Sequence, residues 1–198
     1  WKFFGNLLDA GKVTICGEES AGTGSSHIRE KDGLWAVLLW LNIIAERKQS
    51  VSEILSDHWQ KFGRNYYSRH DYEALPSEAA NTLFNELVER LPTLVGGQFG
   101  EEIVVKADEF SYDDPVDQSI SLHQGVRIFF KSGGRAVFRL SGTGTDGATL
   151  RVYLEQYVGS DGDHAADPQI ILSSIKEAAL QLCQLTRHTG RTVADVVT

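Results

Sequence analysis

The stretch 139–147, with the sequence RLSGTGTDG, combines the residue types that bind a phosphate group. Its glycines let the backbone approach an anion closely, and its Ser and Thr residues add hydroxyl donors. Arg139 begins the stretch and Arg151 follows in the next segment, so two guanidinium groups are available for paired hydrogen bonds to phosphate oxygens. We predict a phosphate site here, and a glycine-rich hairpin turn without a ligand is the alternative.

The glycines at 142, 144 and 147 also satisfy the G-x-G-x-x-G spacing of dinucleotide-binding proteins. That motif needs a helix immediately after it, because the helix N-terminus faces the pyrophosphate. Residues 149–154 alternate between polar and apolar side chains, which indicates a strand. The sequence therefore favours a single-phosphate site over a site for NAD or NADP.

A second polar loop, GEESAGTGSSHIREKDG at 17–33, carries carboxylates, hydroxyls and cations at close spacing. Such groups accept from and donate to sugar hydroxyls, and a buried polar site rejects ligands that leave its groups unpaired. The alternative is a solvated loop that caps the following helix at Asp32. His27 is expected to be a hydrogen-bonding residue of the loop, because no second ligand near it suggests a metal.

The elements around this loop are expected to be mainly helical. Residues 1–16 indicate an amphipathic segment and then a strand. Apolar side chains at 34–45 cover nearly every face, as in a helix buried inside a larger domain. Ser50 and Glu53 form an S-x-x-E capping box, which predicts a surface helix to about residue 61. The pattern breaks at FGRN, so we place a boundary near residue 63, between domains 1–62 and 63–198.

Beyond this boundary the pattern predicts an antiparallel sheet with helices packed on it, an α+β fold. The expected elements are an extended segment at 66–73, a helix at 77–90 that ends at Pro92, a hairpin of 126–130 with 136–140, and a strand at 149–157. Asp167 caps a final helix with Pro168 at its first position. The apolar face of this helix is formed by Ile171, Leu172, Ile175, Leu182 and Leu185.

Composition limits the class of protein. A chain of 198 residues with 41% hydrophobic and 10% aromatic residues suits one or two globular domains. Cys16 and Cys183 lie far apart, which suggests neither a disulfide framework nor a zinc site and fits a cytoplasmic protein. A formal charge of -8 and the lack of a long apolar stretch predict no nucleic-acid partner and no membrane. The start at Trp1 and the absence of Met indicate that the native start lies upstream.

Together the two loops resemble the α-D-phosphohexomutase family, and within it the phosphoglucomutase branch. The loop at 17–33 is similar to the branch's sugar loop GEESFGTGSDHIREKDG, and RLSGTGTDGATLR is similar to its phosphate loop RLSGTGSAGATIR. Further likeness runs through WKFFGNL, SVSEILSDHWQKFGRNYYSRHDYE and HTGRTVADVVT, so it covers most of the chain. The departures are Ala21 for Phe, Ser26 for Asp, and Thr145-Asp146 for Ser-Ala, of which Asp146 brings a carboxylate close to a phosphate site.

The resemblance implies the α/β end of a third domain followed by an α+β fourth domain, similar to the TATA-binding protein, in an enzyme of four domains around one cleft. It implies that Glu18 and Ser20 bind sugar hydroxyls and that Arg29 and Lys31 lie beside the substrate. The phosphate that does not react would be held by residues of the second loop, namely Arg139, Ser141, Gly142, Thr143, Gly144 and Arg151.

The implied activity is that of an isomerase that interconverts glucose 1-phosphate and glucose 6-phosphate through a phosphoserine and glucose 1,6-bisphosphate, with Mg²⁺. The family's T-A-S-H-N serine loop and D-G-D-G-D-R magnesium loop are absent from this sequence, and the DGDH at 161–164 is expected to be an exposed turn. The chain alone is therefore expected to be inactive, with catalytic and metal residues supplied by N-terminal domains of the same protein. The alternative is a non-catalytic phosphosugar-binding or scaffolding homologue.

Overall fold

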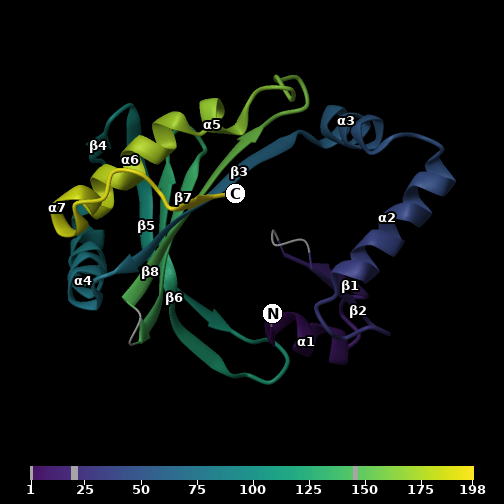
Figure 1. Cartoon of the computed structure of the whole chain (residues 1–198), viewed down its shortest axis with the longest axis horizontal. Helices are drawn as coiled ribbons and strands as arrows, with labels where there is room; N and C mark the ends of the chain where they lie inside the picture. The colour runs from purple at the N-terminus through teal and green to yellow at the C-terminus, as the bar shows by residue number, and fades with distance from the viewer. Residues whose placement is uncertain (1, 19–21, 145–146) are drawn as a thin grey trace. The chain divides into compact units, whose positions relative to one another are not determined.

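The computed structural model describes residues 2–18, 22–144 and 147–198, which pack as two units (Figure 1). The N-terminal unit holds the residues up to His58 together with Tyr112–Ser121, and the C-terminal unit holds Trp59–Ser111 and Leu122–Thr198. The described elements that begin before His58 are α1 (Lys2–Asp9), β1 (Ile15–Gly17), β2 (Thr23–Ser25), α2 (Gly33–Arg47) and α3 (Val51–Phe62).

Strands β1 and β2 form a small antiparallel sheet that carries the first polar loop. Cys16 pairs with Gly24 and Gly17 pairs with Thr23, so the segment 18–22 joins the two strands. The expected order of an amphipathic segment followed by a strand is confirmed. The segment is helix α1, which ends at Asp9, and β1 begins at Ile15.

Helix α2 begins after its N-cap Asp32, whose carboxylate accepts hydrogen bonds from Leu34 N at 2.7 Å and Trp35 N at 3.3 Å. This cap confirms the expected helix start. Within the described residues none of its side chains is buried, and Leu34 is 75% exposed, so the expected burial inside a larger domain stays a prediction. A helix with apolar side chains all round needs neighbours on every side, and the described residues cover only part of its surface.

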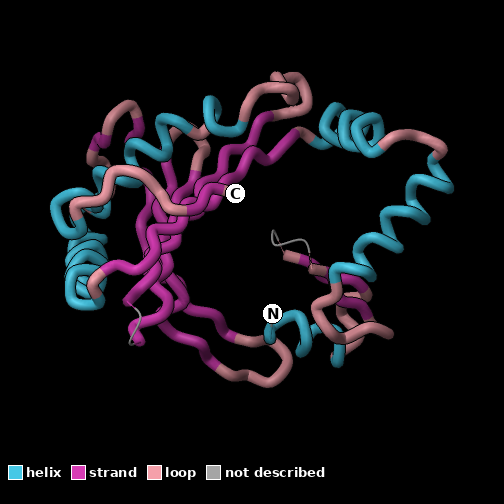
Figure 2. Tube along the Cα trace, viewed as in Figure 1, coloured by secondary structure: helices cyan, strands magenta, loops and turns pink. Residues whose placement is uncertain are grey.

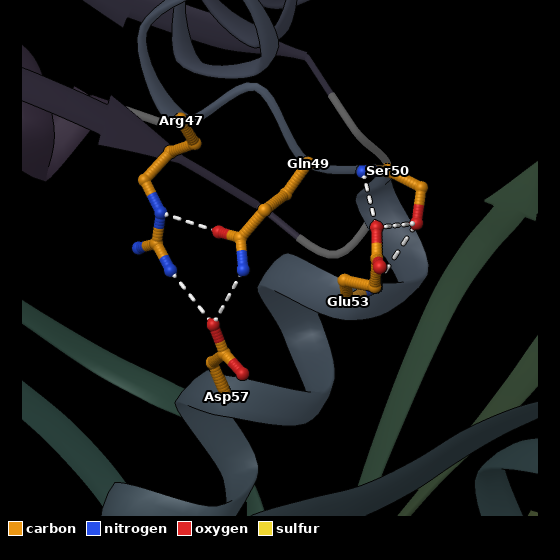
Figure 3. A network of polar contacts seen from close by, with 5 residues as sticks. All are labelled: Arg47, Gln49, Ser50, Glu53 and Asp57. Carbon is orange, nitrogen blue, oxygen red and sulfur yellow. Dashed lines mark hydrogen bonds and ion pairs between the residues drawn. The ribbon is translucent and has the colours of Figure 1, made fainter.

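A network of polar contacts fixes the corner between α2 and α3 (Figure 3). Ser50 N donates to the Glu53 carboxylate at 2.8 Å and Glu53 N donates to Ser50 Oγ at 3.3 Å, which confirms the expected capping box. Arg47 and Gln49 both donate to Asp57 Oδ2, at 2.9 and 3.0 Å. These contacts join the end of α2 to the first turns of α3.

In the described residues, a seven-stranded sheet dominates the rest of the chain, in the order β4-β5-β6-β7-β8-β3-β9. Figure 2 shows its strands in magenta and the helices in cyan. Its strands are β3 (Arg64–Leu75), β4 (Gln98–Phe99), β5 (Glu102–Asp113), β6 (Ile120–Phe130), β7 (Arg135–Gly144), β8 (Gly147–Val158) and β9 (Val196–Val197). Every pair of neighbours with a described register is antiparallel. The first strand of this sheet along the chain is β3, which pairs with β8 on one side and β9 on the other. Later parts of the chain therefore return to both of its edges.

Helices pack on one face of this sheet. They are α4 (Ser77–Leu94), α5 (Pro168–Ile171), α6 (Ser173–Cys183) and α7 (Leu185–Thr189). Leu87 of α4 and Leu182 of α6 are almost completely buried in one core with Leu150 and Leu154 of β8. Because side chains alternate along a strand, Arg151 lies on the opposite face. The expected α+β arrangement is confirmed, while its likeness to the TATA-binding protein stays a prediction.

The tip of the β5–β6 hairpin, residues 112–121, belongs to the N-terminal unit. The Tyr112 ring packs against the Phe3 ring of α1, with 4.2 Å between the ring centroids. The Asn6 amide of α1 donates to Asp114 Oδ2 at 2.8 Å and to Asp117 Oδ2 at 3.0 Å. Asp114 is almost completely buried, so these contacts hold the hairpin tip on α1.

Two helix boundaries differ from the expectation. Helix α4 continues through Pro92 to Leu94, because the buried side chains Leu91 and Leu94 extend its apolar stripe for a further turn. The single final helix is divided into α5, α6 and α7, with breaks at Leu172 and at Gln184, whose backbone is left-handed. Asp167 caps the first of these segments as expected, accepting from Gln169 N at 2.7 Å.

Candidate functional site

The first candidate site centres on an ion pair at the start of the polar loop. Lys31 Nζ donates to Glu18 Oε2, and the two side chains are 37% and 30% exposed. This hydrogen bond holds the pKa of Glu18 below its usual range, against the opposing effect of partial burial. Glu18 is therefore ionised at neutral pH and can only accept hydrogen bonds, while Lys31 can only donate them.

Gly22 lets Lys31 reach Glu18 across the loop. A Cβ atom added at Gly22 would overlap the Lys31 side chain, lying for example 2.6 Å from its Cε atom. Only a residue without a side chain leaves room for this crossing. Sequence reasoning missed this role of Gly22, since the spacing of nine positions from Lys31 gives no sign of the contact.

Glu18 and Lys31 line a cavity of about 740 Å³ within the N-terminal unit. Its polar side is completed by Gly22, Thr23 and Gly33. Its apolar side is the surface of α2, formed by Ala36, Val37, Leu39, Trp40 and Leu41. A hollow with an apolar wall and a charged pair at one side suits a sugar ring, which has apolar C–H groups as well as hydroxyls.

Backbone contacts hold the rest of the loop in place. Thr23 and Asp32 exchange backbone hydrogen bonds of 3.3 and 3.1 Å, which brings the two ends of the segment together. His27 Nδ1 lies 3.0 Å from Ser25 Oγ, and its ring meets Trp35 edge-on. His27 is thus a hydrogen-bonding residue of the loop, as expected.

The other residues predicted for this site are less closely associated with the cavity. The Arg29 guanidinium pairs with Asp9 of α1 and donates to Ser26 O at 3.3 Å. Arg29 is not among the residues that line the cavity in the described part of the chain, so its place beside a substrate stays a prediction. Ser20 lies outside the described residues, as does Ala21.

The second candidate site is the end of the β7–β8 hairpin. Strand β7 runs through Gly142, Thr143 and Gly144, so most of the stretch expected as a loop is strand. The register shifts between Ser141, which pairs with Thr149, and Gly144, which pairs with Gly147. Such an irregularity disturbs the regular ladder and frees backbone groups for a ligand. Thr145 and Asp146 lie outside the described residues.

Gly147 begins β8 where the end of β3 approaches the hairpin. Its φ angle is +93°, and an added Cβ atom would lie 2.9 Å from Leu75 O. Both the backbone conformation and the close approach require glycine at this position. The hairpin end is therefore fixed against the last residues of β3.

Arg139 and Arg151 lie directly opposite each other on β7 and β8. Like charges in this position repel each other unless a counter-charge lies near them. Arg151 has one in Asp71 of β3, with 3.7 Å between Arg151 Nε and Asp71 Oδ2. Arg139 is exposed, makes no ion pair with any residue that the structure describes, and has its side-chain stem beside Gly125 of β6. Two guanidinium groups side by side can bind an anion.

The dinucleotide alternative is excluded by the element after the glycines. Gly147–Val158 form strand β8, where a dinucleotide site needs a helix N-terminus. The DGDH segment forms a turn in which Gly162 N donates to Gly159 O at 3.0 Å, and His164 Nε2 lies 2.8 Å from the same oxygen. Over 2–18, 22–144 and 147–198, no group of three or more His, Cys, Asp or Glu residues is arranged to hold a metal ion.

Comparisons with known proteins match the N-terminal and the C-terminal part of the chain to one family. Residues 64–195 match the model of the phosphoglucomutase-1 C-terminal domain. Residues 1–62 match the model of the phosphoglucomutase/phosphomannomutase α/β/α domain III. The chain belongs to the phosphoglucomutase family. This confirms the resemblance that the two loops indicated.

Individual phosphoglucomutases align along the whole chain. A phosphoglucomutase of Rhizobium radiobacter is 57% identical and human phosphoglucomutase-1 is 53% identical, each over 100% of this chain and 36% of the relative. The open form of pp63/parafusin, a phosphoglucomutase from Paramecium, superposes with a TM-score of 0.86 at 47% identity, over 100% of this chain and 35% of that one. The chain thus spans about a third of the length of these phosphoglucomutases.

Membership of the phosphoglucomutase family leaves one feature of the second site unassigned. Asp71 is almost completely buried beside Arg151, yet sequence reasoning treated the segment around it only as extended chain. The register between β3 and β8, which depends on residues 80 positions apart, is what brings the two together.

None of the described helices of this chain is long and apolar enough to cross a membrane.

Proposed function

We propose that this chain is the substrate-binding part of a phosphoglucomutase that, as a whole protein, interconverts glucose 1-phosphate and glucose 6-phosphate. The observation that carries the proposal is the match to phosphoglucomutases along the entire chain, at 57% identity in one case. Both ligand loops fall within that match. The hexose phosphate is the proposed substrate, and the remaining N-terminal domains of the same protein are the proposed partners.

The N-terminal loop is proposed to bind the sugar. Glu18 accepts hydrogen bonds from sugar hydroxyls, because its pairing with Lys31 keeps it ionised. Lys31 and Ser20 add donors, and Arg29 lies beside the substrate. A hydroxyl in the wrong position would leave one of these polar groups without a partner, which gives the loop its selectivity.

The C-terminal hairpin is proposed to bind the phosphate that does not react. Arg139 and Arg151, opposite each other on β7 and β8, supply the charge. Ser141, Thr143 and the backbone N–H groups of Gly142 and Gly144 supply neutral donors. Asp146, which lies outside the described residues, brings one carboxylate near this set in the sequence.

The proposed role of both loops is positioning. In the reaction, a phosphoserine of the whole protein gives its phosphate to glucose 1-phosphate, and the resulting glucose 1,6-bisphosphate returns its other phosphate to the serine. The phosphate site must therefore accept the phosphate of either end of the sugar. A hairpin that binds phosphate through charge and backbone donors satisfies this demand, since it recognises the phosphate and not the carbon that carries it.

Metal chemistry is not assigned to this chain. Mg²⁺ prefers clusters of carboxylate and other oxygen ligands, and the described residues contain no such cluster. The magnesium and phosphoserine loops are proposed to lie in the other two thirds of the protein. The whole protein is proposed to be cytoplasmic.

The whole protein should convert glucose 1-phosphate to glucose 6-phosphate when Mg²⁺ and glucose 1,6-bisphosphate are added, as followed by ³¹P NMR. The 198-residue chain alone should give no turnover above background. Binding of glucose 1-phosphate without turnover by the whole protein would instead favour a non-catalytic phosphosugar-binding homologue.

A further inference from the structure

The buried carboxylate of Asp71 lies in a row of charged residues on the face of the sheet opposite the helices. Arg139 of β7 is opposite Arg151 of β8, and Arg151 is opposite Asp71 of β3. Asp71 is in turn opposite Val196 of β9. Residues directly opposite each other in a sheet lie on the same face, so this row connects Asp71 with the candidate phosphate site.

The burial of Asp71 is not explained by packing in the core. Its side chain is only 5% exposed, although it lies on the face opposite the helices. Asp71 Oδ1 is 3.1 Å from Arg69 Nε and Oδ2 is 3.7 Å from Arg151 Nε, and Oδ1 makes no hydrogen bond of good geometry with any described residue. Burying a charged pair costs about as much as the attraction returns, so stability alone gives no reason for a carboxylate here.

The contact with Arg151 leaves that residue free to bind an anion. The ion pair uses Nε, so the two terminal nitrogens of the guanidinium are not the atoms that face Asp71. Without the carboxylate, repulsion from Arg139 would turn the Arg151 guanidinium away from its neighbour. With it, Arg151 is held from one side while its outer edge stays available.

We propose that Asp71 is a positioning residue for phosphate binding, which holds the Arg151 guanidinium beside Arg139. This inference rests on the proposed function, because it gives Asp71 a role in the same phosphate site. Asp71 itself does not contact the ligand and makes or breaks no bond.

The test is steady-state kinetics of the whole protein with glucose 1-phosphate. Asp71→Asn should raise KM about three- to tenfold and change kcat less, the size expected when one partly exposed ion pair no longer orients a guanidinium. Inhibition by inorganic phosphate should weaken by a similar factor. Asp195→Asn is the matched control, since Asp195 also pairs with an arginine and bonds the β3 backbone but does not touch Arg151; its KM should stay within twofold of wild type.

A double-variant comparison separates positioning from general destabilisation. In an Arg151→Ala background, Asp71→Asn should cause no further rise in KM, because the residue through which it acts is gone. An equal rise with and without Arg151, or no rise in the single variant, would overturn the proposal. If Asp71→Asn does not fold, as judged by its thermal midpoint, Asp71→Ser removes the same charge with a smaller side chain.

Arg139→Ala distinguishes failure of this inference from failure of the proposed function. If Arg139→Ala raises KM while Asp71→Asn does not, the phosphate site stands and the positioning role is wrong. If neither substitution changes KM or the inhibition by phosphate, the hairpin is not the phosphate site and both proposals fall.

Discussion

Arg135 and Arg139 lie on the same strand and the same face of the sheet, yet only Arg135 has a carboxylate partner in the part of the chain that the structure describes. That partner is Glu155, directly opposite on β8. An arginine that pairs with a carboxylate helps to stabilise the sheet, whereas an exposed arginine without a partner is available to a ligand. The two residues therefore form a natural pair for comparison.

In the whole protein, Arg139→Ala should lower kcat/KM for glucose 1-phosphate roughly 10- to 100-fold, since a charged hydrogen bond is worth about 1.5 to 3 kcal/mol. Arg135→Ala should stay within about threefold of wild type, because a partly exposed ion pair contributes little. Initial rates at low substrate concentration measure both. Equal losses in the two variants would remove Arg139 from a special role.

Gly22→Ala should weaken sugar binding by pushing Lys31 off Glu18. The expected result is a rise in KM for glucose 1-phosphate of up to about tenfold. A tenfold rise corresponds to a loss of about 1.4 kcal/mol of binding free energy. Inhibition by inorganic phosphate should be unchanged, since phosphate alone does not need the sugar loop. Gly5→Ala is the control, because an added Cβ atom there meets nothing within 4 Å and Gly5 does not line the described cavity. A similar effect of both substitutions would contradict the steric argument.

His70 should make the fold sensitive to mild acid. It is buried on the core face of β3, and burial, followed by the charge of Lys176, lowers its pKa below the usual value of 6.5. As pH falls through about 6.5 the unfolded chain takes up a proton before the folded chain does, so stability is lost toward pH 5.

Urea unfolding of the chain between pH 5 and 8 measures this effect against His70→Gln, which has no group to titrate at this position. The wild type should lose more stability than the variant between about pH 7 and pH 5, while above about pH 7.5 the difference between them should be constant. Parallel curves over the whole range would show that His70 does not carry the acid sensitivity.

Among single residues, the sequence predicted those whose chemistry is visible in their type. The carboxylate of Glu18 and the cap of Asp32 follow from residue identity and local spacing, and the structure describes both as hydrogen-bonded. Gly22 and Asp71 could not be predicted in this way. Their roles depend on which side chain crosses the loop and which strand lies alongside, and neither is encoded in neighbouring residues.

Helix α2 is the element whose exposure to solvent departs most from what its apolar sequence predicts. Leu38 and Leu41 are each 55% exposed, and Leu34 and Val37 lie on the surface as well. The phosphoglucomutases that match the chain contain further sequence outside the matched third. We infer that in the whole protein another part of domain III covers this apolar surface.

The 198-residue chain by itself should therefore self-associate or bind a hydrophobic dye through α2. Leu38→Glu with Leu41→Glu should reduce both effects without lowering the thermal midpoint, because the two side chains are already largely in water. The same pair of substitutions in the whole protein should destabilise it. Analytical ultracentrifugation and dye fluorescence give the first result, and a monomeric wild-type chain that binds no dye would contradict the argument.

Elements with strong local signals were predictable, and those that depend on distant packing were not. The capping box at Ser50 and the hairpin of β6 with β7 follow from short motifs. Pro92 was expected to end α4, but buried Leu94 makes a further turn favourable despite the missing backbone donor. Strand β5 was not expected, since its charged residues hide the alternation, and its place in the sheet is set by β4 and β6.

At the scale of the molecule, the division into units does not follow the order of the sequence. The hairpin tip, residues 112–121, is part of the N-terminal unit although it lies between two strands of the large sheet. A boundary near residue 63 was the natural interpretation of the sequence, because local patterns change there. The contacts of Asn6 with Asp114 and Asp117 join residues more than 100 positions apart, and no local pattern reports them.

Asn6→Ala should loosen the tip of the β5–β6 hairpin without disturbing the β7–β8 hairpin. Two hydrogen bonds to carboxylates are lost, and the buried carboxylate of Asp114 then has fewer donors. Hydrogen exchange should become faster for amides of 112–121 and of α1, and should be unchanged for Val152 and Leu154 of β8. Uniformly faster exchange would indicate global destabilisation, and no change at 112–121 would show that Asn6 does not hold the tip.

The position of the hairpin tip also bears on how phosphoglucomutases can exchange parts by recombination. A crossover near residue 63 would separate the two domains expected from the sequence, yet it would combine α1 of one parent with the hairpin tip of another. Phe3 and Asn6 would come from the first parent, while Tyr112 and Asp114, which they contact, would come from the second. Chimaeras made at this point should fold best when the parents share these residues, so the inherited unit is a pair of separated segments and not a continuous stretch of sequence.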